Sequence, residues 1–101
     1  MSDFNFEDLD VYQRTLDFVD SIYEITINFP KEELYSLTNQ LRRAATSIAL
    51  NIGEGAGSTD KAFINYLRVA SDSLKECVVC LTIANRRNYI SNNTNNELRS
   101  E

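Results

Sequence analysis

The sequence predicts an all-α protein: an antiparallel up-down four-helix bundle in which the fourth helix has only begun when the chain ends. Its composition supports this, because 101 residues with only three Gly and one Pro contain few positions that interrupt a helix. Its hydrophobic pattern agrees, since apolar residues recur at three- and four-residue spacing over three long segments. Short links between these segments favour antiparallel neighbours within one domain, residues 1–101.

The first helix is expected at about residues 8–28 and ends before Pro30, because the residue preceding a proline is disfavoured in the helical conformation. Its apolar seam has helical spacing and consists of Leu9, Tyr12, Leu16, Val19, Tyr23 and Thr26.

The second helix is expected at about residues 36–54, ahead of the glycine run "GEGAG". We interpret this run as a C-cap and tight connector rather than a phosphate loop, because it follows a helix and no Lys-Ser or Lys-Thr closes it. The third helix is expected at about residues 60–87, with Thr59 as its N-cap.

A capping-box pattern, "TNNE" at Thr94–Glu97, predicts a fourth helix at about residues 95–101. This helix would be a stub. We therefore expect either that the chain continues beyond Glu101 or that another subunit covers the rest of the bundle.

The net charge of −5 is unevenly distributed. Residues 1–33 carry nine acidic and two basic side chains, whereas residues 34–93 carry seven basic and four acidic ones. One interpretation is a basic face that contacts nucleic acid through Arg42, Arg68, Lys75, Arg86 and Arg87. We favour the other, mixed charges on solvated helix faces, and expect any binding of nucleic acid to be weak and salt-sensitive.

The residue types argue against an enzyme or a metal protein. The chain has no His, which is the commonest general base and metal ligand. Cys77 and Cys80 form a C-x-x-C pair, but a zinc site needs further ligands and a redox pair normally stands at a helix N-terminus. We interpret both as buried small apolar residues. We predict no catalytic residue, no metal, no cofactor and no small-molecule substrate.

No apolar run approaches the ~18 residues of a membrane span. The first ten residues are acidic, unlike a signal peptide. We therefore expect a cytoplasmic protein without membrane contact.

A row of polar residues follows one edge of the second helix, within about 80° on a helical wheel: Gln40, Arg43, Ser47, Asn51 and Glu54. Ser73 and Glu76 of the third helix are candidate partners. We expect Asn51 to bond to Ser73, and Arg43 to pair with Glu54 or Glu76. We expect a largely buried structural network that fixes helix register, because unpaired buried polar groups cost about 1–3 kcal/mol each. The alternative is a catalytic or ligand site, although the row lacks an obvious pair of nucleophile and base.

The third helix carries two apolar stripes. The stripe expected to face the core consists of Phe63, Leu67, Ala70, Leu74, Cys77 and Leu81. The second stripe lies roughly 60–120° away and consists of Ala62, Tyr66, Val69, Ser73 and Cys80. Three helices and a stub cannot cover both stripes, so we expect a subunit interface at Leu50, Ala62, Tyr66, Val69 and Cys80. The alternative is that an absent fourth helix covers the second stripe.

The segments "FPKEELYSLTNQLRRAATSIALNIGEGAG" and "FINYLRVASDSLKE" resemble the bacterial four-helix bundle family, also called the 23S ribosomal-RNA intervening-sequence protein family. The opening "LDVYQRTLDFVDSIYEI" is similar to its first helix, so the resemblance spans about residues 8–90. The family's motif residues correspond to Gln40, Arg43, Ser47, Asn51, Glu54, Gly55, Ser73 and Glu76.

The resemblance implies a small up-down bundle to which no enzymatic activity is ascribed. A relative in diversity-generating retroelements forms a homopentameric barrel and binds nucleic acid beside a reverse transcriptase, so the resemblance also implies a homopentamer. This chain departs from that basic relative by being acidic, and from the family by its short fourth helix.

Two function hypotheses follow. The first is a non-catalytic oligomeric scaffold that associates with RNA or an RNA-handling partner. The second is a protein–protein interaction module in which the polar row is purely structural. A continuous surface of the five candidate basic residues favours the first, whereas interleaving with Asp60, Asp72 and Glu76 favours the second.

Overall fold

The computed structural model describes residues 6–99, which fold into α-helices and short 3-10 helices without a strand. The elements in chain order are η1 (Phe6–Asp8), α1 (Asp10–Thr26), η2 (Lys31–Glu33), α2 (Leu37–Gly55), α3 (Asp60–Arg86) and α4 (Asn92–Arg99). This confirms the all-α prediction. Residues 100 and 101 of the expected fourth helix lie outside the described residues.

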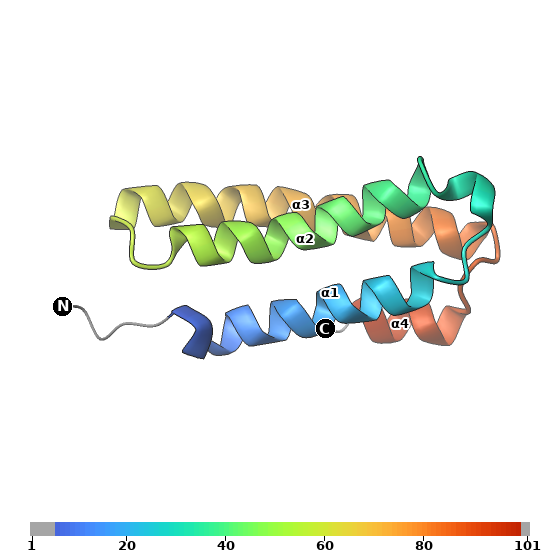
Figure 1. The fold of residues 1–101 in the computed structure, drawn as a ribbon, viewed down its shortest axis with the longest axis horizontal. Coiled ribbons are helices and arrows are strands. Elements are labelled where there is room, and N and C mark those ends of the chain that lie inside the picture. Colours follow the sequence, from blue (N-terminus) through green and yellow to red (C-terminus); the bar gives the residue numbers. More distant parts are fainter. Residues whose placement is uncertain (1–5, 100–101) are drawn as a thin grey trace.

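The helices form a rod of 49 × 21 × 20 Å. α2 and α3 run antiparallel along most of its length, α1 lies against α2, and α4 lies beside the C-terminal part of α3 (Figure 1). α4 ends near the middle of the rod, so it occupies only part of the fourth position of the bundle (Figure 1).

Side-chain caps fix several helix ends. Thr59 accepts a hydrogen bond from the Ala62 N–H at 3.2 Å, which confirms the predicted N-cap of α3. The expected start of α4 is wrong, because Ser91 rather than Thr94 caps it. The Ser91 Oγ accepts from the Thr94 N–H at 3.0 Å, so α4 begins three residues earlier than the capping-box pattern suggested.

The turn after α3 has the bonding of a Schellman motif. The Tyr89 N–H donates to the Ala84 carbonyl at 2.8 Å, and the Asn88 N–H donates to the Asn85 carbonyl at 3.0 Å. Asn88 takes the left-handed conformation with φ 64°, which asparagine tolerates better than most residues. This turn directs the chain into α4.

The glycine run contains the expected C-cap and tight connector at Gly57, which directly follows the C-cap residue Ala56, but the other two glycines act differently. α2 continues through Gly53 and Gly55, and only Gly57 has the left-handed backbone, with φ 81°. A Cβ at Gly55 would lie 2.7 Å from Cδ1 of Phe63 and 2.8 Å from Cβ of Tyr66. Gly55 is therefore required for the close approach of α2 and α3.

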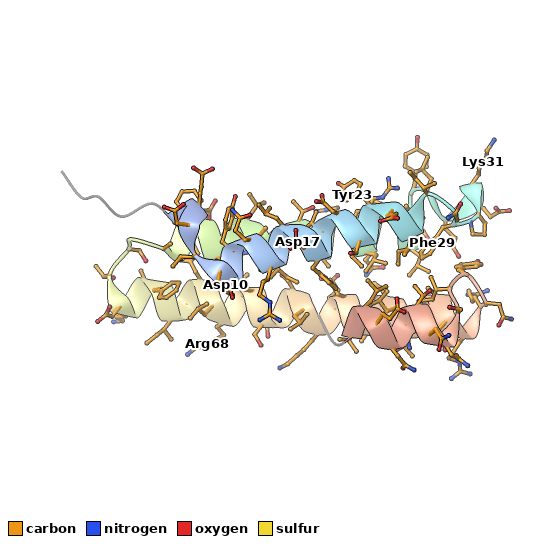
Figure 2. All side chains as sticks on the ribbon, turned by 90° about the horizontal axis from the view of Figure 1, so that it is seen from below. Asp10, Asp17, Tyr23, Phe29, Lys31 and Arg68 are labelled. Atoms are coloured by element: carbon orange, nitrogen blue, oxygen red, sulfur yellow. The ribbon has the colours of Figure 1, made fainter. Side chains whose placement is uncertain are left out.

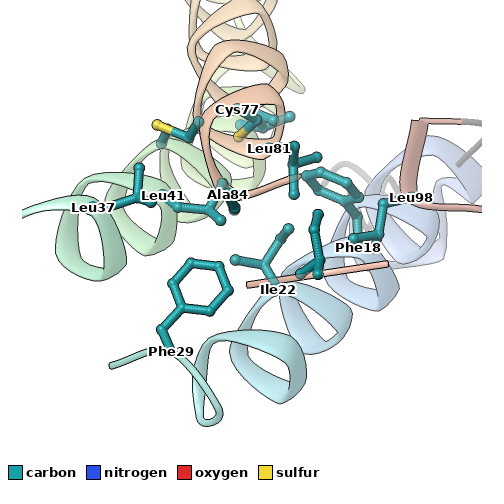
Figure 3. Close-up of a cluster of buried hydrophobic side chains, with 14 of the residues drawn as sticks. Phe18, Ile22, Phe29, Leu37, Leu41, Cys77, Leu81, Ala84 and Leu98 are labelled. Carbon is teal, nitrogen blue, oxygen red and sulfur yellow. The ribbon is translucent and has the colours of Figure 1, made fainter. Parts of the chain in front are cut away.

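The core lies where α1, α2 and α3 meet, with single contributions from the turns and α4 (Figure 3). Its largest fully buried side chains are Ile22, Leu41, Leu81 and Cys77, and Phe29 and Leu98 close it at either side (Figure 3). Because α4 is short, Leu98 is its main contribution to this cluster.

The burial of the two apolar stripes of α3 differs in part from the prediction. Ser73 and Cys80 of the second stripe are buried against α2, whereas Leu67 and Leu74 of the expected core stripe are 40% and 48% exposed. α2 packs where α3 presents small side chains, because these permit the closest approach. The bulkier leucines then face the partly empty fourth position.

Leu81 and Leu74 of α3 provide a matched test of this packing, because one is buried and the other is half exposed. Leu81→Ala should lower the free energy of unfolding by about 2–5 kcal/mol, because Leu81 is only 1% exposed. Leu74→Ala should cost less than about 1 kcal/mol, because Leu74 is half exposed. Urea denaturation measures both values. Equal losses in the two variants would show that Leu74 is covered in solution.

Candidate functional site

A polar groove opens between α2 and α3 at the end of the rod where α2 begins. Its volume is about 510 Å³. The side chains that give it chemical character come from the preceding turn, from α2 and from α3: Tyr35, Asn39, Gln40, Arg43, Ser73 and Glu76. Most of the polar row predicted from the sequence therefore borders one groove.

The floor of the polar groove is a contact between two serines. The Ser73 Oγ donates to the Ser47 Oγ at 2.9 Å and so joins α3 to α2. Asn51 Nδ2 donates to the Ser47 carbonyl at 2.8 Å and to its Oγ at 3.2 Å. Asn51 thus bonds within its own helix, and Ser47 takes the contact with Ser73 that was expected of Asn51.

Gln40, Arg43 and Glu54 are exposed, which contradicts the expected burial of the polar row. The reason is geometric: α2 and α3 approach through small residues, so long side chains at the edge of the contact project into solvent. Within residues 6–99, Arg43 has no hydrogen-bond or ion-pair partner. Glu76 is exposed, and among the described residues its carboxylate has a hydrogen bond only from Gln40 Nε2, at the long distance of 3.5 Å.

The turn that leads into the groove is held by Glu33. The Ser36 Oγ donates to one carboxylate oxygen at 2.8 Å, and the Tyr89 hydroxyl donates to the other at 2.9 Å. The hydrogen bonds from Ser36 and then Tyr89 lower the pKa of Glu33 below its ordinary 4.5, and the bond to Glu33 raises the pKa of Tyr89. This arrangement holds the turn that carries Tyr35, whose side chain borders the groove and is 90% exposed.

The two cysteines lie in the core as free thiols. Burial, with smaller effects of Cys80 and Glu76, raises the pKa of Cys77 to about 12. Burial also raises the pKa of Cys80. Both thiols are therefore protonated near neutral pH and poor as nucleophiles or metal ligands. Among the described residues, no three His, Cys, Asp or Glu side chains are grouped so that they could hold a metal ion.

A row of exposed basic residues follows the outer face of α3. Lys61, Arg68, Lys75 and Arg86 are separated by seven, seven and eleven residues, which places them within about 40° on the helix over about 38 Å. We call this set the basic row. Arg68 points away from α1 at the outer edge of α3 (Figure 2). Lys61 was missed by the sequence analysis, although the seven-residue spacing to Arg68 was a signal for it.

Two other predicted basic candidates lie elsewhere. Arg42 Nε donates to the Thr26 Oγ1 at 2.8 Å, and its guanidinium lies 4.7 Å from the centre of the Tyr23 ring, so it joins α2 to α1. Arg87 follows the end of α3, and its positive charge contributes to lowering the pKa of Glu33 and opposes the raised pKa of Tyr89. Of the predicted acidic neighbours, Asp72 lies one turn from both Arg68 and Lys75 and so interleaves with the basic row, whereas Asp60 projects about 100° from Lys61 and Glu76 borders the polar groove. Because Arg42 and Arg87 lie outside the row, the five predicted basic residues do not form one continuous surface.

Exposed acidic residues lie on α1: Asp10, Asp17, Asp20 and Glu24. They fall within about 80° on the helix and so form an acidic face. Figure 2 shows Asp17 on α1 and Arg68 on the outer edge of α3. α1 carries these four acids and one basic residue, Arg14, whereas α3 carries four basic and three acidic side chains. The charge asymmetry of the sequence thus becomes an asymmetry between faces.

An apolar groove of about 490 Å³ lies between α1 and α3, with α2 below it and Leu98 of α4 at one end. Leu67, Leu74 and Val78 of α3 form one wall, and Val11 and Phe18 of α1 form the other. α4 covers only the C-terminal part of α3 in this position (Figure 2).

Only some residues of the candidate subunit interface are exposed to solvent. Leu50 and Val69 are 57% and 48% exposed, and they flank the Ser47–Ser73 contact on the outside of α2 and α3. Ala62 and Tyr66 are half-buried. Cys80 is only 2% exposed. Its inclusion is wrong, because the packing of α2 already covers it.

The sequence profile of the 23S rRNA-intervening sequence protein family matches residues 7–101, which includes all of α1, α2, α3 and α4. The chain belongs to this family. A comparison with curated proteins gave no match. The family's name states no catalytic function. Within the described part of this family member, no helix is both long and apolar enough to cross a bilayer.

The Glu33–Tyr89 bond predicts an acid-sensitive contribution to stability. Because the pKa of Glu33 is lowered in the folded state, its contribution is present above the ordinary 4.5 and is lost as the pH falls through the folded pKa. Tyr89→Phe should therefore lower the melting temperature at neutral pH, and the difference from the unmodified protein should shrink at about pH 3.

Tyr12→Phe is the matched control, because no hydrogen bond of the Tyr12 hydroxyl is found within residues 6–99. Thermal unfolding followed by circular dichroism measures both variants. A difference for Tyr89→Phe that does not change with pH would contradict the assigned bond.

Proposed function

We propose that the protein is a non-catalytic helical-bundle scaffold that associates with RNA through the basic row of α3. The observation that carries this proposal is the alignment of Lys61, Arg68, Lys75 and Arg86 on one exposed helix face. The acidic face on α1 repels a polyanion and so leaves the side of α3 as the favourable approach. We propose RNA as the polyanion because the family's name links its members to intervening sequences of 23S rRNA.

The proposed association is weak and electrostatic. A helix face with four cations neutralises only a few phosphates, against a net charge of −5. Cytoplasmic function is part of the proposal, and the two free thiols are compatible with a reducing compartment.

Binding of single-stranded RNA tests the proposal. A plot of log affinity against log salt concentration should have a slope of about −3, because each contacted phosphate contributes about −0.7. Arg68→Ala with Lys75→Ala should make the slope shallower by about 1.4 and weaken binding of all sequences alike. Fluorescence anisotropy over a salt series gives both values.

The matched control is Arg14→Ala with Lys31→Ala, which removes one Arg and one Lys from outside the basic row. This control should leave the slope unchanged. Equal effects of the two double variants, or no binding at low salt, would overturn the proposal. Tight binding that survives physiological salt would contradict its electrostatic basis.

We further propose that the scaffold is a homo-oligomer, with five copies as the number implied by the family resemblance. Leu50 and Val69 support an interface on the outside of α2 and α3, since both expose apolar surface at the same level of the antiparallel pair. Val69→Glu should reduce the mass measured by light scattering to that of one 11.5 kDa chain. Val79→Glu is the control, because Val79 is 58% exposed on a different face of α3.

A mass of one chain for the unmodified protein, over a wide concentration range, would contradict oligomerisation. Dissociation by Val79→Glu but not by Val69→Glu would place the interface elsewhere.

The second candidate function is a protein–protein interaction module. The apolar groove favours it, because exposed Leu67 and Leu74 provide apolar surface of the kind found at protein interfaces. Failure of RNA binding together with a self-associating or partner-bound protein would favour this candidate.

A further inference from the structure

We propose that the polar groove between α2 and α3 binds an unpaired guanine base. This inference rests on the proposed association with RNA and adds a base-reading site to it. The basic row contacts phosphates and carries no sequence information, whereas the polar groove places hydrogen-bonding side chains of both signs around one hollow.

The two helices that border the groove each place one charged side chain at it, and these two charges are opposite. Arg43 on α2 is exposed and has no partner within residues 6–99, so its guanidinium donors are available to a ligand. In the part of the chain that the structure describes, Glu76 on α3 has only the 3.5 Å hydrogen bond from Gln40, so its carboxylate retains acceptor capacity. A simple anion is disfavoured by Glu76 and a simple cation by Arg43.

Guanine can form hydrogen bonds with Arg43 and with Glu76 at the same time. Its O6 and N7 accept hydrogen bonds and are the preferred base atoms for a bidentate arginine. Its N1–H and 2-amino group are donors that suit a carboxylate such as Glu76. Adenine lacks this arrangement, because it has no N1–H and no 2-amino group. The carboxamides of Asn39 and Gln40 add donors and acceptors at the same level of the groove.

An aromatic side chain stands at the rim of the groove. Tyr35 is 90% exposed, although its turn is held in place by the hydrogen bonds of Glu33 to Ser36 and Tyr89. Unpaired bases commonly stack on exposed aromatic rings. Tyr35 therefore supplies a stacking surface beside the hydrogen-bonding groups.

The groove and the basic row belong to the same stretch of α3. Lys75 of the row precedes Glu76 of the groove and projects about 100° from it around the helix. A single strand whose phosphates follow the row can therefore turn one base across α3 toward the groove. The floor is rigid there, because Ser73 and Ser47 join the two helices.

Short RNAs that differ at one position test the proposal. The probes are uridine decamers with a single central guanosine, adenosine or inosine, measured by anisotropy at low salt. The guanosine probe should bind about tenfold more tightly than the adenosine probe. Inosine lacks only the 2-amino group, so it should show an intermediate affinity.

Matched variants separate base reading from charge. Glu76→Gln and Asp72→Asn each remove one negative charge from neighbouring turns of α3, but only Glu76 borders the groove. Glu76→Gln should abolish the guanosine preference and Asp72→Asn should preserve it. In the same way, Arg43→Ala should abolish the preference, whereas Arg68→Ala should weaken all three probes equally.

The outcomes distinguish this inference from the proposed function. RNA binding without a guanosine preference, or a preference that Glu76→Gln leaves intact, overturns the guanine site while RNA association stands. If no probe binds, the proposed function fails. Guanosine monophosphate is then titrated against adenosine monophosphate in ¹⁵N NMR spectra. Guanosine-specific shifts of the Asn39 and Gln40 side-chain amides support the site, and their absence overturns it.

Discussion

α2 and α3 approach so closely that one position along their contact has no room for a side chain. A Cβ at Gly55 would lie 2.7 Å from the Phe63 ring. Further along the pair, two serines meet directly, at 2.9 Å. Small residues on both helices permit this approach. The antiparallel α2–α3 pair is therefore the frame on which α1 and α4 are placed.

The candidate surfaces follow from this frame. Close packing of α2 and α3 brings Arg43 and Glu76 to the edges of one polar groove and leaves their long side chains in solvent. It also turns the small side of α3 inward, so the opposite side carries Lys61, Arg68, Lys75 and Arg86. Leu67 and Leu74 are left facing the position that α4 fills only in part.

Charge separation adds a second constraint on function. The acidic residues of α1 and the basic residues of α3 lie on different helices, so a net charge of −5 does not describe every face of the rod. The acidic face of α1 repels a polyanion, whereas α3 presents four basic side chains together with three acidic ones. This directional field is compatible with weak, oriented binding rather than with a general affinity for nucleic acid.

The sequence by itself determined the helical class, the three long helices and the cap at Thr59, because helix periodicity and capping are local properties. It also identified the polar row and placed most of it correctly at a helix edge. Only the tertiary structure decided which stripe of α3 is buried, since a wheel shows two apolar arcs but not which of them a neighbour will cover. The wheel likewise gave no reason to expect that Arg43 would be exposed or that Gly55 would be a packing contact. These depend on the distance between α2 and α3, which is set by side chains far apart in the sequence.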